Sequence, residues 1–497
     1  MEGPATAPAA RRPGSLSAAV LRGLGWKAGS QVVELGTRTL VAVVLARLLG
    51  PHEFGLAGMA VAFSGLGHAF ADAALTPAVV QRRDLTDVDR ATALWLSLGA
   101  GAAMTVLGIA ASGLVAGFFG EPRVRALFAL LSCGFLLGAL GALPSALLAR
   151  ALDFRRLELC GMAGGVTGAV VGIACALGGV GAESIVAQRL VGLAATGALL
   201  WLATPWRPVL AFSPASMRAL GGFGLSVLGS RLFFYLQRNA DNLLVGRVLG
   251  ASALGAYALA YNLVLLPFTQ LVDPVRSVLF PAFAAIQADR ARVGALWLRS
   301  TRVLAAVLLP AMVGLVVVAS DLVAAVLGQR WQAAIAPIHV LAVVGMAQSL
   351  IGVNSVALTA IGRTGMLLRF SIVTFVVSLA GFAVGVRWGV VGVAAGYLAA
   401  NALIVPIYMR LTAHALDLGL GRVAAALGGV TQAAAMTLVC VLTIRFLLVV
   451  LHVPAGARLA VVALTGLPIA CALAIHRVPE LRAELRVAYR SLAAGTH

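Results

Sequence analysis

The sequence predicts an all-α polytopic membrane protein with about fourteen transmembrane helices. Of its 497 residues, 61% are hydrophobic and only 11% are charged, and the mean hydropathy is +0.99. Soluble domains carry about 25% charged residues. The apolar residues form repeated stretches of about 20 residues, the length that an α-helix needs to cross a bilayer. No segment shows the period of two that a membrane β-barrel requires.

Fourteen apolar stretches are predicted as membrane spans. Several are longer than about 25 residues, which indicates tilted or kinked helices. The predicted spans are residues 28–49, 54–78, 91–118, 125–147, 157–178, 182–203, 223–248, 253–283, 297–319, 333–360, 367–386, 389–410, 425–450 and 457–475.

The net charge of +19 indicates the orientation of the chain and not a nucleic-acid partner. Most of the 37 Lys and Arg residues fall in the two tails and in every second loop. Because cytoplasmic loops are enriched in Lys and Arg, we expect both termini in the cytoplasm. We expect no removable signal peptide. The five cysteines lie in predicted spans without metal or redox spacing.

An internal repeat relates residues 29–66 to residues 229–266 without a gap. Nine of the aligned positions are identical, where this composition gives roughly three or four by chance. Six spans separate the copies, and an even number predicts lobes related by an axis along the membrane normal. The identical pairs are Gly29/Gly229, Ser30/Ser230, Arg38/Arg238, Arg47/Arg247, Leu49/Leu249, Gly50/Gly250, Gly55/Gly255, Ala60/Ala260 and Leu66/Leu266.

The repeat divides the chain into two six-helix lobes followed by an appended helix pair. The linker between the lobes carries three prolines, and a short interfacial helix is predicted from Pro214. The predicted parts are a tail at 1–27, the first lobe at 28–203, the linker at 204–222, the second lobe at 223–411, the helix pair at 412–475 and a tail at 476–497.

Two stripes of polar residues fall at matching places in the first span of each lobe. Helical spacing puts Gln31, Glu34 and Arg38 on one face of the first span. A charged group at the centre of a span costs about 2.5–3.5 kcal/mol unless water or a partner receives it. Ion pairs between helices would explain the stripes, but their matching positions favour a shared cavity. The second stripe and its polar neighbours are Arg231, Tyr235, Arg238, Asn239, Asp241 and Asn242.

For other ionisable residues of the spans, the sequence gives a weaker indication of a functional role. Glu34, Asp72 and Asp273 are candidates for coupling transport to a cation, and Asp273 has Arg276 three residues away. Arg189, beside Gln188, fits a structural or a functional role equally well. For Arg47, Arg247 and Arg445, which lie near span ends, we expect side chains that extend to the membrane surface.

The residue inventory favours transport of an anion over catalysis. Arginines outnumber carboxylates within the spans, and the planar fork of Arg suits a phosphate group, so a diphosphate head group fits better than a neutral sugar or a cation. There is no P-loop, no HExxH motif and no Cys/His zinc spacing, so we expect no enzyme activity, no cofactor and no metal. No external loop is long enough to carry catalytic carboxylates.

The fifth predicted span is rich in glycine at small-xxx-small spacing, which permits close approach of helix backbones. We expect these residues to pack helices within a lobe, with dimerisation as the alternative. They are Gly161, Gly164, Gly165, Gly168 and Gly172.

Several motifs, in this order, resemble Wzx-type polysaccharide flippases over about residues 20–410. The run from Leu45 to Gly55 (LARLLGPHEFG) is similar to the LaRlLGpeeFG stretch of that family. The other matching motifs are Gln81-Arg82, Phe118-Phe119 before Glu121-Pro122, Leu148-Ala149-Arg150 before Asp153-Phe154, Asp241, Gly246, Leu249-Gly250, Gly255, Tyr257, Pro267, Phe280-Pro281, Pro310, Gly328, Trp331 and Gly362-Arg363.

The resemblance implies the polysaccharide-transporter branch of the multidrug/oligosaccharidyl-lipid/polysaccharide exporter superfamily. Such proteins have two six-helix lobes in a V around a cationic cavity. They move undecaprenyl-diphosphate-linked oligosaccharides across the bacterial inner membrane for lipopolysaccharide or exopolysaccharide synthesis. Membrane lipids, a polysaccharide polymerase and glycosyltransferases are the partners that this role implies.

Three alternatives stay open. A cation-coupled multidrug exporter of the same superfamily would need an acidic and aromatic cavity. A peptidoglycan-precursor flippase would share the diphosphate head group. A polytopic glycosyltransferase or polymerase would need longer external loops than this sequence has.

Overall fold

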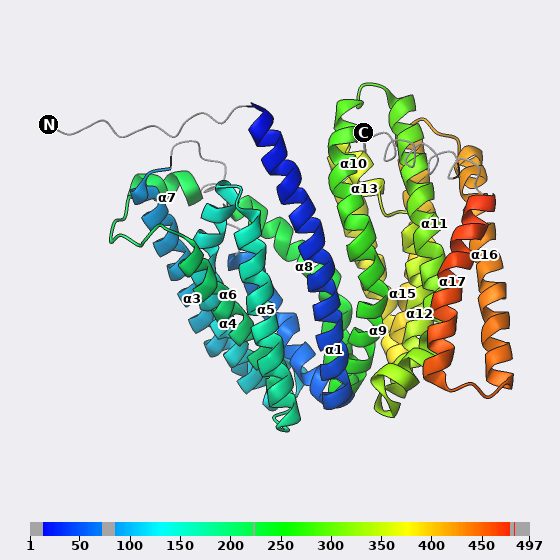
Figure 1. The fold of residues 1–497 in the computed structure, drawn as a ribbon, viewed down its shortest axis with the longest axis horizontal. Coiled ribbons are helices and arrows are strands. Elements are labelled where there is room, and N and C mark those ends of the chain that lie inside the picture. Colours follow the sequence, from blue (N-terminus) through cyan, green and yellow to red (C-terminus); the bar gives the residue numbers. More distant parts are fainter. Residues whose placement is uncertain (1–12, 72–84, 222–223, 478–481, 483–497) are drawn as a thin grey trace. The chain divides into compact units, whose positions relative to one another are not determined.

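The computed structural model of the chain describes residues 13–71, 85–221, 224–477 and 482 (Figure 1). Every regular element in these ranges is a helix. Eleven runs of helix among them are long and apolar enough to cross a membrane. The predicted class, an all-α multi-pass membrane protein, is confirmed.

The first of two compact units comprises Met1–Leu49 and Leu56–Asn239. Its helices pack mainly as neighbours in sequence, with α3 against α4 and α5 against α6. The elements are α1 (Pro13–Ala71), which residues 50–55 interrupt, then α3 (Asp87–Phe119), α4 (Arg123–Arg150), α5 (Phe154–Leu177), α6 (Glu183–Ala203), α7 (Pro214–Gly221) and the part of α8 (Gly224–Leu249) up to Asn239.

The short helix α7 begins at Pro214, as predicted for the linker. A capping box starts α3: the Thr86 side chain accepts from the backbone N–H of Asp89, and Asp89 accepts from the backbone N–H of Thr86. Asp89 is buried, and its carboxylate also accepts a hydrogen bond of 2.6 Å from the Ser216 hydroxyl of α7. The N-terminus of α3 therefore holds the linker helix.

The second unit comprises Gly50–Gly55 and Ala240–His497. Two short π-helical segments continue α9 and α11, where an extra residue enters the turn. After the end of α8 the elements are α9 (Ala251–Pro267), η1 (Phe268–Val272), α10 (Asp273–Ala285), α11 (Arg290–Leu322), η2 (Val323–Leu327), η3 (Gln329–Ala334), α12 (Ile335–Ser349), α13 (Asn354–Ala360), α14 (Thr364–Gly385), η4 (Val386–Trp388), α15 (Gly389–Ala415), α16 (Leu420–Val450) and α17 (Ala455–Arg477).

Two glycines that the repeat aligns adopt the same rare backbone conformation. Gly50 has φ 76° and ψ 174°, and it breaks α1 into two helices. Gly250 has φ 84° and ψ −178°, and it separates α8 from α9. Only glycine adopts this region without strain. The same break at both places supports the alignment of residues 29–66 with 229–266.

The segments that follow these glycines pack against each other reciprocally within the second unit. A Cβ added at Gly55 would lie 1.8 Å from the carbonyl oxygen of Ala251, and one added at Gly255 would lie 2.0 Å from that of Pro51. Residues 51 and 251 are themselves equivalent under the repeat. The backbones of the two copies therefore touch at matching positions where no side chain fits.

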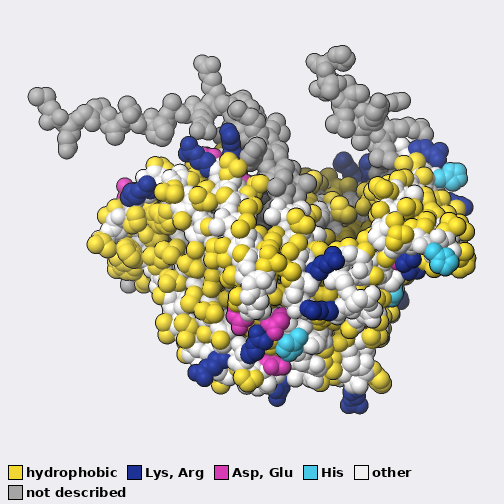
Figure 2. Space-filling view, turned by 60° about the horizontal axis from the view of Figure 1, so that its bottom comes forward, with side chains coloured by type: hydrophobic (Ala, Val, Ile, Leu, Met, Phe, Trp, Pro, Cys, Tyr) yellow, Lys and Arg dark blue, Asp and Glu magenta, His cyan; other side chains and the backbone are white. Residues whose placement is uncertain are grey.

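Apolar side chains cover much of the surface, as the lipid environment of a multi-pass protein requires (Figure 2). Leu114 and Leu202 are each 78% exposed, and Leu464 is 75% exposed. In a soluble protein, contiguous exposed apolar surface of this kind would drive aggregation. Its presence on nearly every long helix agrees with burial in a bilayer.

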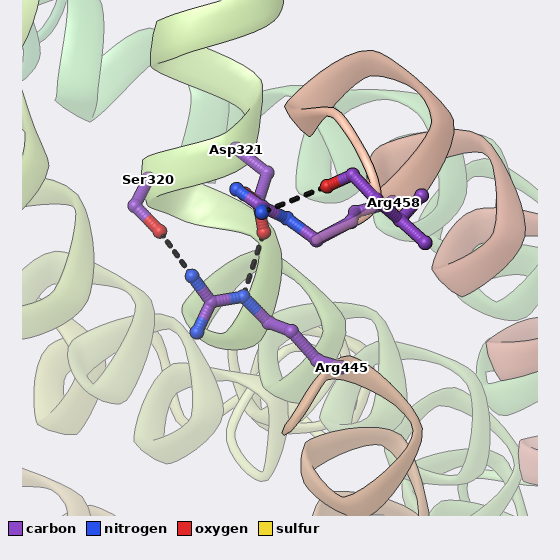
Figure 3. A network of polar contacts seen from close by, with 5 residues as sticks. Ser320, Asp321, Arg445 and Arg458 are labelled. Carbon is purple, nitrogen blue, oxygen red and sulfur yellow. Dashed lines mark hydrogen bonds and ion pairs between the residues drawn. The ribbon is translucent and has the colours of Figure 1, made fainter. Parts of the chain in front are cut away.

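A buried carboxylate fastens the last two helices to α11 (Figure 3). Asp321 is 2% exposed. Its Oδ2 accepts from Nε of Arg445 in α16 at 2.6 Å, and its Oδ1 accepts from Nη2 of Arg458 in α17 at 2.6 Å. Arg445 also donates to the Ser320 hydroxyl at 2.7 Å. The expectation that Arg445 extends to the membrane surface is wrong, because this side chain turns inward to a carboxylate.

Replacing Asp321 with Asn should destabilise the packing of α16 and α17 on α11. The change leaves two guanidinium groups without their anion, and removing one partner from a buried ion pair costs about 3–5 kcal/mol. We expect a clearly lower midpoint of thermal unfolding for Asp321→Asn in detergent. Asp417→Asn, at an exposed residue, is the matched control. An unchanged midpoint would mean that the ion pairs do not hold these helices.

Replacing Gly55 with Ala should also lower stability, because the new methyl group meets the carbonyl of Ala251 and the backbones must separate. Forcing a methyl group into close packing costs about 1–3 kcal/mol. Gly428→Ala in α16 is the control, since a Cβ there meets nothing within 4 Å. It should leave stability unchanged or raise it by up to about 1 kcal/mol. Equal midpoints for both variants would contradict the contact.

Candidate cationic cavity

A cavity of about 580 Å³ lies within the first unit, between α1, α5 and α6. Its volume falls in the range of small-molecule sites, about 300–1,000 Å³. Most of the lining is apolar. The polar side chains on its wall are Thr37, Arg38, Gln188, Arg189 and Thr196.

Helical spacing explains how the polar residues reach the cavity. On α1, Thr37, Arg38 and Val41 occupy one face, and on α6 a continuous face runs from Ile185 to Thr196 at steps of three and four. Gln188 and Arg189 lie in the second turn of α6. Each helix therefore presents one guanidinium group to the same space.

The two guanidinium groups share one cavity. Arg38 and Arg189 both line it, from α1 and from α6. Arg38 is exposed and Arg189 is half-buried. Like charges in a partly dehydrated space raise each other's free energy, and an anion bound between them lowers it. The arrangement is suited to a phosphate or carboxylate ligand.

The helices α5 and α6, which both line this cavity, pack closely against each other. A Cβ added at Gly164 would lie 2.0 Å from Thr196 Oγ1, and one at Gly168 would lie 2.4 Å from the Gln188 carbonyl oxygen. At Gly172 the nearest atom is Gln188 Cβ, at 2.6 Å. These three glycines pack helices within the unit, as predicted. They also bring α6 near enough for Gln188 and Arg189 to share a space with α1.

Tyr235 binds to the second half of α1. Its hydroxyl donates to the Ala62 carbonyl at 2.7 Å. Gly65 makes room for the ring, because a Cβ there would lie 2.1 Å from the Tyr235 oxygen. On the same helix, Asn239 donates to the Tyr235 carbonyl at 3.0 Å, and Arg238 is exposed. Tyr235, Arg238 and Asn239 are not among the residues that line the cavity.

Asp241 and Asn242 belong to the second unit. Asp241 is 3% exposed, and its carboxylate accepts from the Tyr257 hydroxyl at 2.9 Å and from the Asn242 backbone N–H at 2.8 Å. Within the described part of the chain, the buried Oδ1 of Asn242 has no hydrogen-bond partner. Tyr257 stacks on Tyr261, with ring centroids 6.3 Å apart. These contacts make Asp241 part of a buried network between α8 and α9.

The structure describes the remaining predicted site residues only in part. The side chains of Gln31, Glu34 and Arg231, and all of Asp72, lie outside the described residues. Asp273 is exposed and forms an ion pair of 3.2 Å with Arg276, whose Nε donates to the Gly352 carbonyl at 2.6 Å. No group of three or more His, Cys, Asp or Glu residues in the described ranges could hold a metal ion.

Arg189 is the cavity residue for which sequence reasoning gave no decision. It is the single arginine of its predicted span, 182–203, and it lies outside residues 29–66, which the repeat relates to residues 229–266. The available signal was the charge of Arg189 itself, because ionisable residues within a span usually face the interior of the bundle or a water-filled cavity.

Fold and sequence comparisons define the class of protein. The structure is similar to that of the lipid II flippase MurJ in its inward closed conformation, with a TM-score of 0.70 at 13% identity, covering 93% of this chain and 99% of that chain. This likeness shows the fold, which is that of an all-α multi-pass membrane protein.

The sequence places the chain within that class. The family described as polysaccharide biosynthesis protein matches residues 44–336, and the chain belongs to this family of Wzx-like transporters. The lipopolysaccharide biosynthesis protein WzxC of Escherichia coli is 28% identical over 400 residues, which cover 77% of this chain and 79% of WzxC. The succinoglycan biosynthesis transport protein ExoT of Rhizobium meliloti is 29% identical over 315 residues, 63% of each chain. The family resemblance seen in the sequence is confirmed.

Replacing Tyr235 with Phe separates a packing role from a ligand role. We expect a loss of about 1 kcal/mol of stability, because a single hydrogen bond to the Ala62 carbonyl is removed while the ring stays in place. Polysaccharide export in cells should be unchanged. Lost export with an unaltered thermal midpoint would instead make the hydroxyl a substrate ligand.

Proposed function

We propose that the protein flips an undecaprenyl-diphosphate-linked oligosaccharide from the cytoplasmic to the outer leaflet of a bacterial inner membrane. The observation that carries this proposal is the cavity that holds Arg38 and Arg189 together. Within a family of polysaccharide transporters, a substrate that all members could share is the lipid-linked sugar, and its charged part is the diphosphate.

The chemistry of the cavity agrees with a diphosphate. A guanidinium group is planar and offers two parallel N–H donors to a phosphate, which a neutral sugar cannot exploit. Gln188, Thr37 and Thr196 add uncharged hydrogen-bonding groups beside the two charges. Under this proposal Arg38 and Arg189 hold the diphosphate, and Arg231 and Arg238 join them during part of the cycle.

We propose a pathway of alternating access between two six-helix lobes, residues 28–203 and 223–411, built on fourteen spans. Helix bounds support this count: α1 is broken at Gly50, one of the eleven runs contains both α14 and α15, and the 26-residue α8 adds another. The matched conformations of Gly50 and Gly250 support lobes related by a parallel repeat. The charge bias of the loops supports cytoplasmic termini.

Gln31 and Glu34 would line the pathway in the first lobe. Tyr235, Asn239, Asp241 and Asn242 lie outside the cavity of about 580 Å³, and under this proposal they border the pathway elsewhere. For coupling to a cation, Glu34 and Asp72 are better candidates than Asp273. The Asp273 carboxylate already has Arg276 at 3.2 Å, which lowers its affinity for another cation.

The alternatives differ in the charge that they require. A cation-coupled drug exporter would need an anionic or aromatic cavity, whereas the two charged residues that line this one, among the side chains that the structure describes, are arginines. A peptidoglycan-precursor flippase would use the same diphosphate chemistry, and the relatives named for lipopolysaccharide and succinoglycan synthesis favour a surface polysaccharide. A polymerase and glycosyltransferases are the partners expected of such a flippase.

Replacing Arg38 and Arg238 together with Ala should abolish polysaccharide export while the protein still inserts in the membrane. Two cationic contacts to the diphosphate are lost, and each charge-assisted hydrogen bond contributes about 1.5–3 kcal/mol. The measurement is surface polymer in a host whose own flippase gene is deleted and which expresses the variant. Arg125→Ala, an exposed arginine at the start of α4, is the control. Full export by the double variant at normal protein level would refute the site.

A further inference from the structure

The α5 wall of the cavity differs chemically from the walls that carry the charges. Gly161, Met162, Gly165, Val166 and Ala169 all line the cavity, and none is polar. Both guanidinium groups come from the opposite walls, α1 and α6. The cavity is therefore amphipathic, with cationic groups on two helices and an apolar surface on the third.

Two rows of glycine on α5 have opposite surroundings. Gly164, Gly168 and Gly172 face atoms of α6 at less than 3 Å from an added Cβ, so packing accounts for them. An added Cβ at Gly161 or at Gly165 meets nothing within 4 Å. Packing therefore does not require glycine at these two positions, and their effect is to leave space in the cavity.

We infer that this cavity binds the junction between the diphosphate and the isoprenoid chain of a lipid-linked substrate. Arg38 and Arg189 hold the phosphates, and the first isoprene units lie in the space beside Gly161 and Gly165. The inference rests on the proposed function and adds to it the part of the substrate that the first lobe recognises. Neither free diphosphate nor sugar would use the apolar α5 wall.

Binding to the full-length protein in phosphatidylcholine nanodiscs tests the inference. Farnesyl diphosphate, inorganic diphosphate, farnesol and a short-chain phosphatidic acid are titrated separately by calorimetry. Farnesyl diphosphate should bind at least about tenfold more tightly than each of the other three, because burial of even two or three methylene groups is worth a factor of about ten.

Variants locate the two parts of the ligand. Gly165→Leu fills the open space and should weaken farnesyl diphosphate about tenfold while leaving inorganic diphosphate unchanged. Arg189→Gln should weaken both. Gly113→Leu in α3 is the matched control, since a Cβ there also meets nothing within 4 Å and the residue is outside the cavity. A thermal midpoint for Gly165→Leu equal to that of Gly113→Leu shows that the fold is kept.

Three outcomes would overturn the inference: equal binding of farnesyl diphosphate and inorganic diphosphate, equal binding of phosphatidic acid, or unchanged farnesyl diphosphate affinity in Gly165→Leu. None of them decides the flippase proposal, which the export assay of the Arg38 and Arg238 double variant tests separately. Lost export in that variant together with any of these results would leave a flippase that holds the isoprenoid elsewhere.

Discussion

A charge inside a hydrocarbon layer must be neutralised or hydrated, and this constraint separates the arginines of the protein into two kinds. Arg445 and Arg458 both pair with Asp321, a carboxylate within the protein, and these contacts pack three helices together. Arg38 and Arg189 line one cavity. The first arrangement joins helices, whereas the second places two guanidinium groups beside a space that an anion can enter.

The glycines follow the same division between structure and binding. At Gly55, Gly255 and the row on α5 that faces α6, the absence of a side chain lets backbones touch. At Gly161 and Gly165 it leaves a volume that another molecule can fill. The two faces of α5 together create the cavity. Close backbone contact on one face brings α6 near, and the missing side chains on the adjacent face leave the space beside α5 open.

Much of the fold can be predicted from the sequence, because a helix that crosses lipid needs a long apolar stretch. Such stretches predicted membrane-spanning helices, Pro214 predicted the start of the linker helix, and the repeat aligned Gly50 with Gly250. The division of the α5 glycines was not predictable, since both rows satisfy the same spacing and only neighbouring helices distinguish them. Asp321 lies just beyond a predicted span, and its two arginine partners are more than a hundred residues away in sequence. The sequence therefore did not predict that the Arg445 side chain pairs with this carboxylate. Arg189 could not be assigned without knowing which helix faces it.

The Asp321 contact also has a consequence for biogenesis. Arg445 is 124 residues downstream of this carboxylate and Arg458 is 137 residues downstream. At roughly 5–20 residues per second, the ribosome needs about 6–25 seconds to deliver the first of them. During that interval the nascent chain carries an acidic group that these partners do not yet neutralise. Final assembly of this region must therefore wait until the ribosome has passed Arg458.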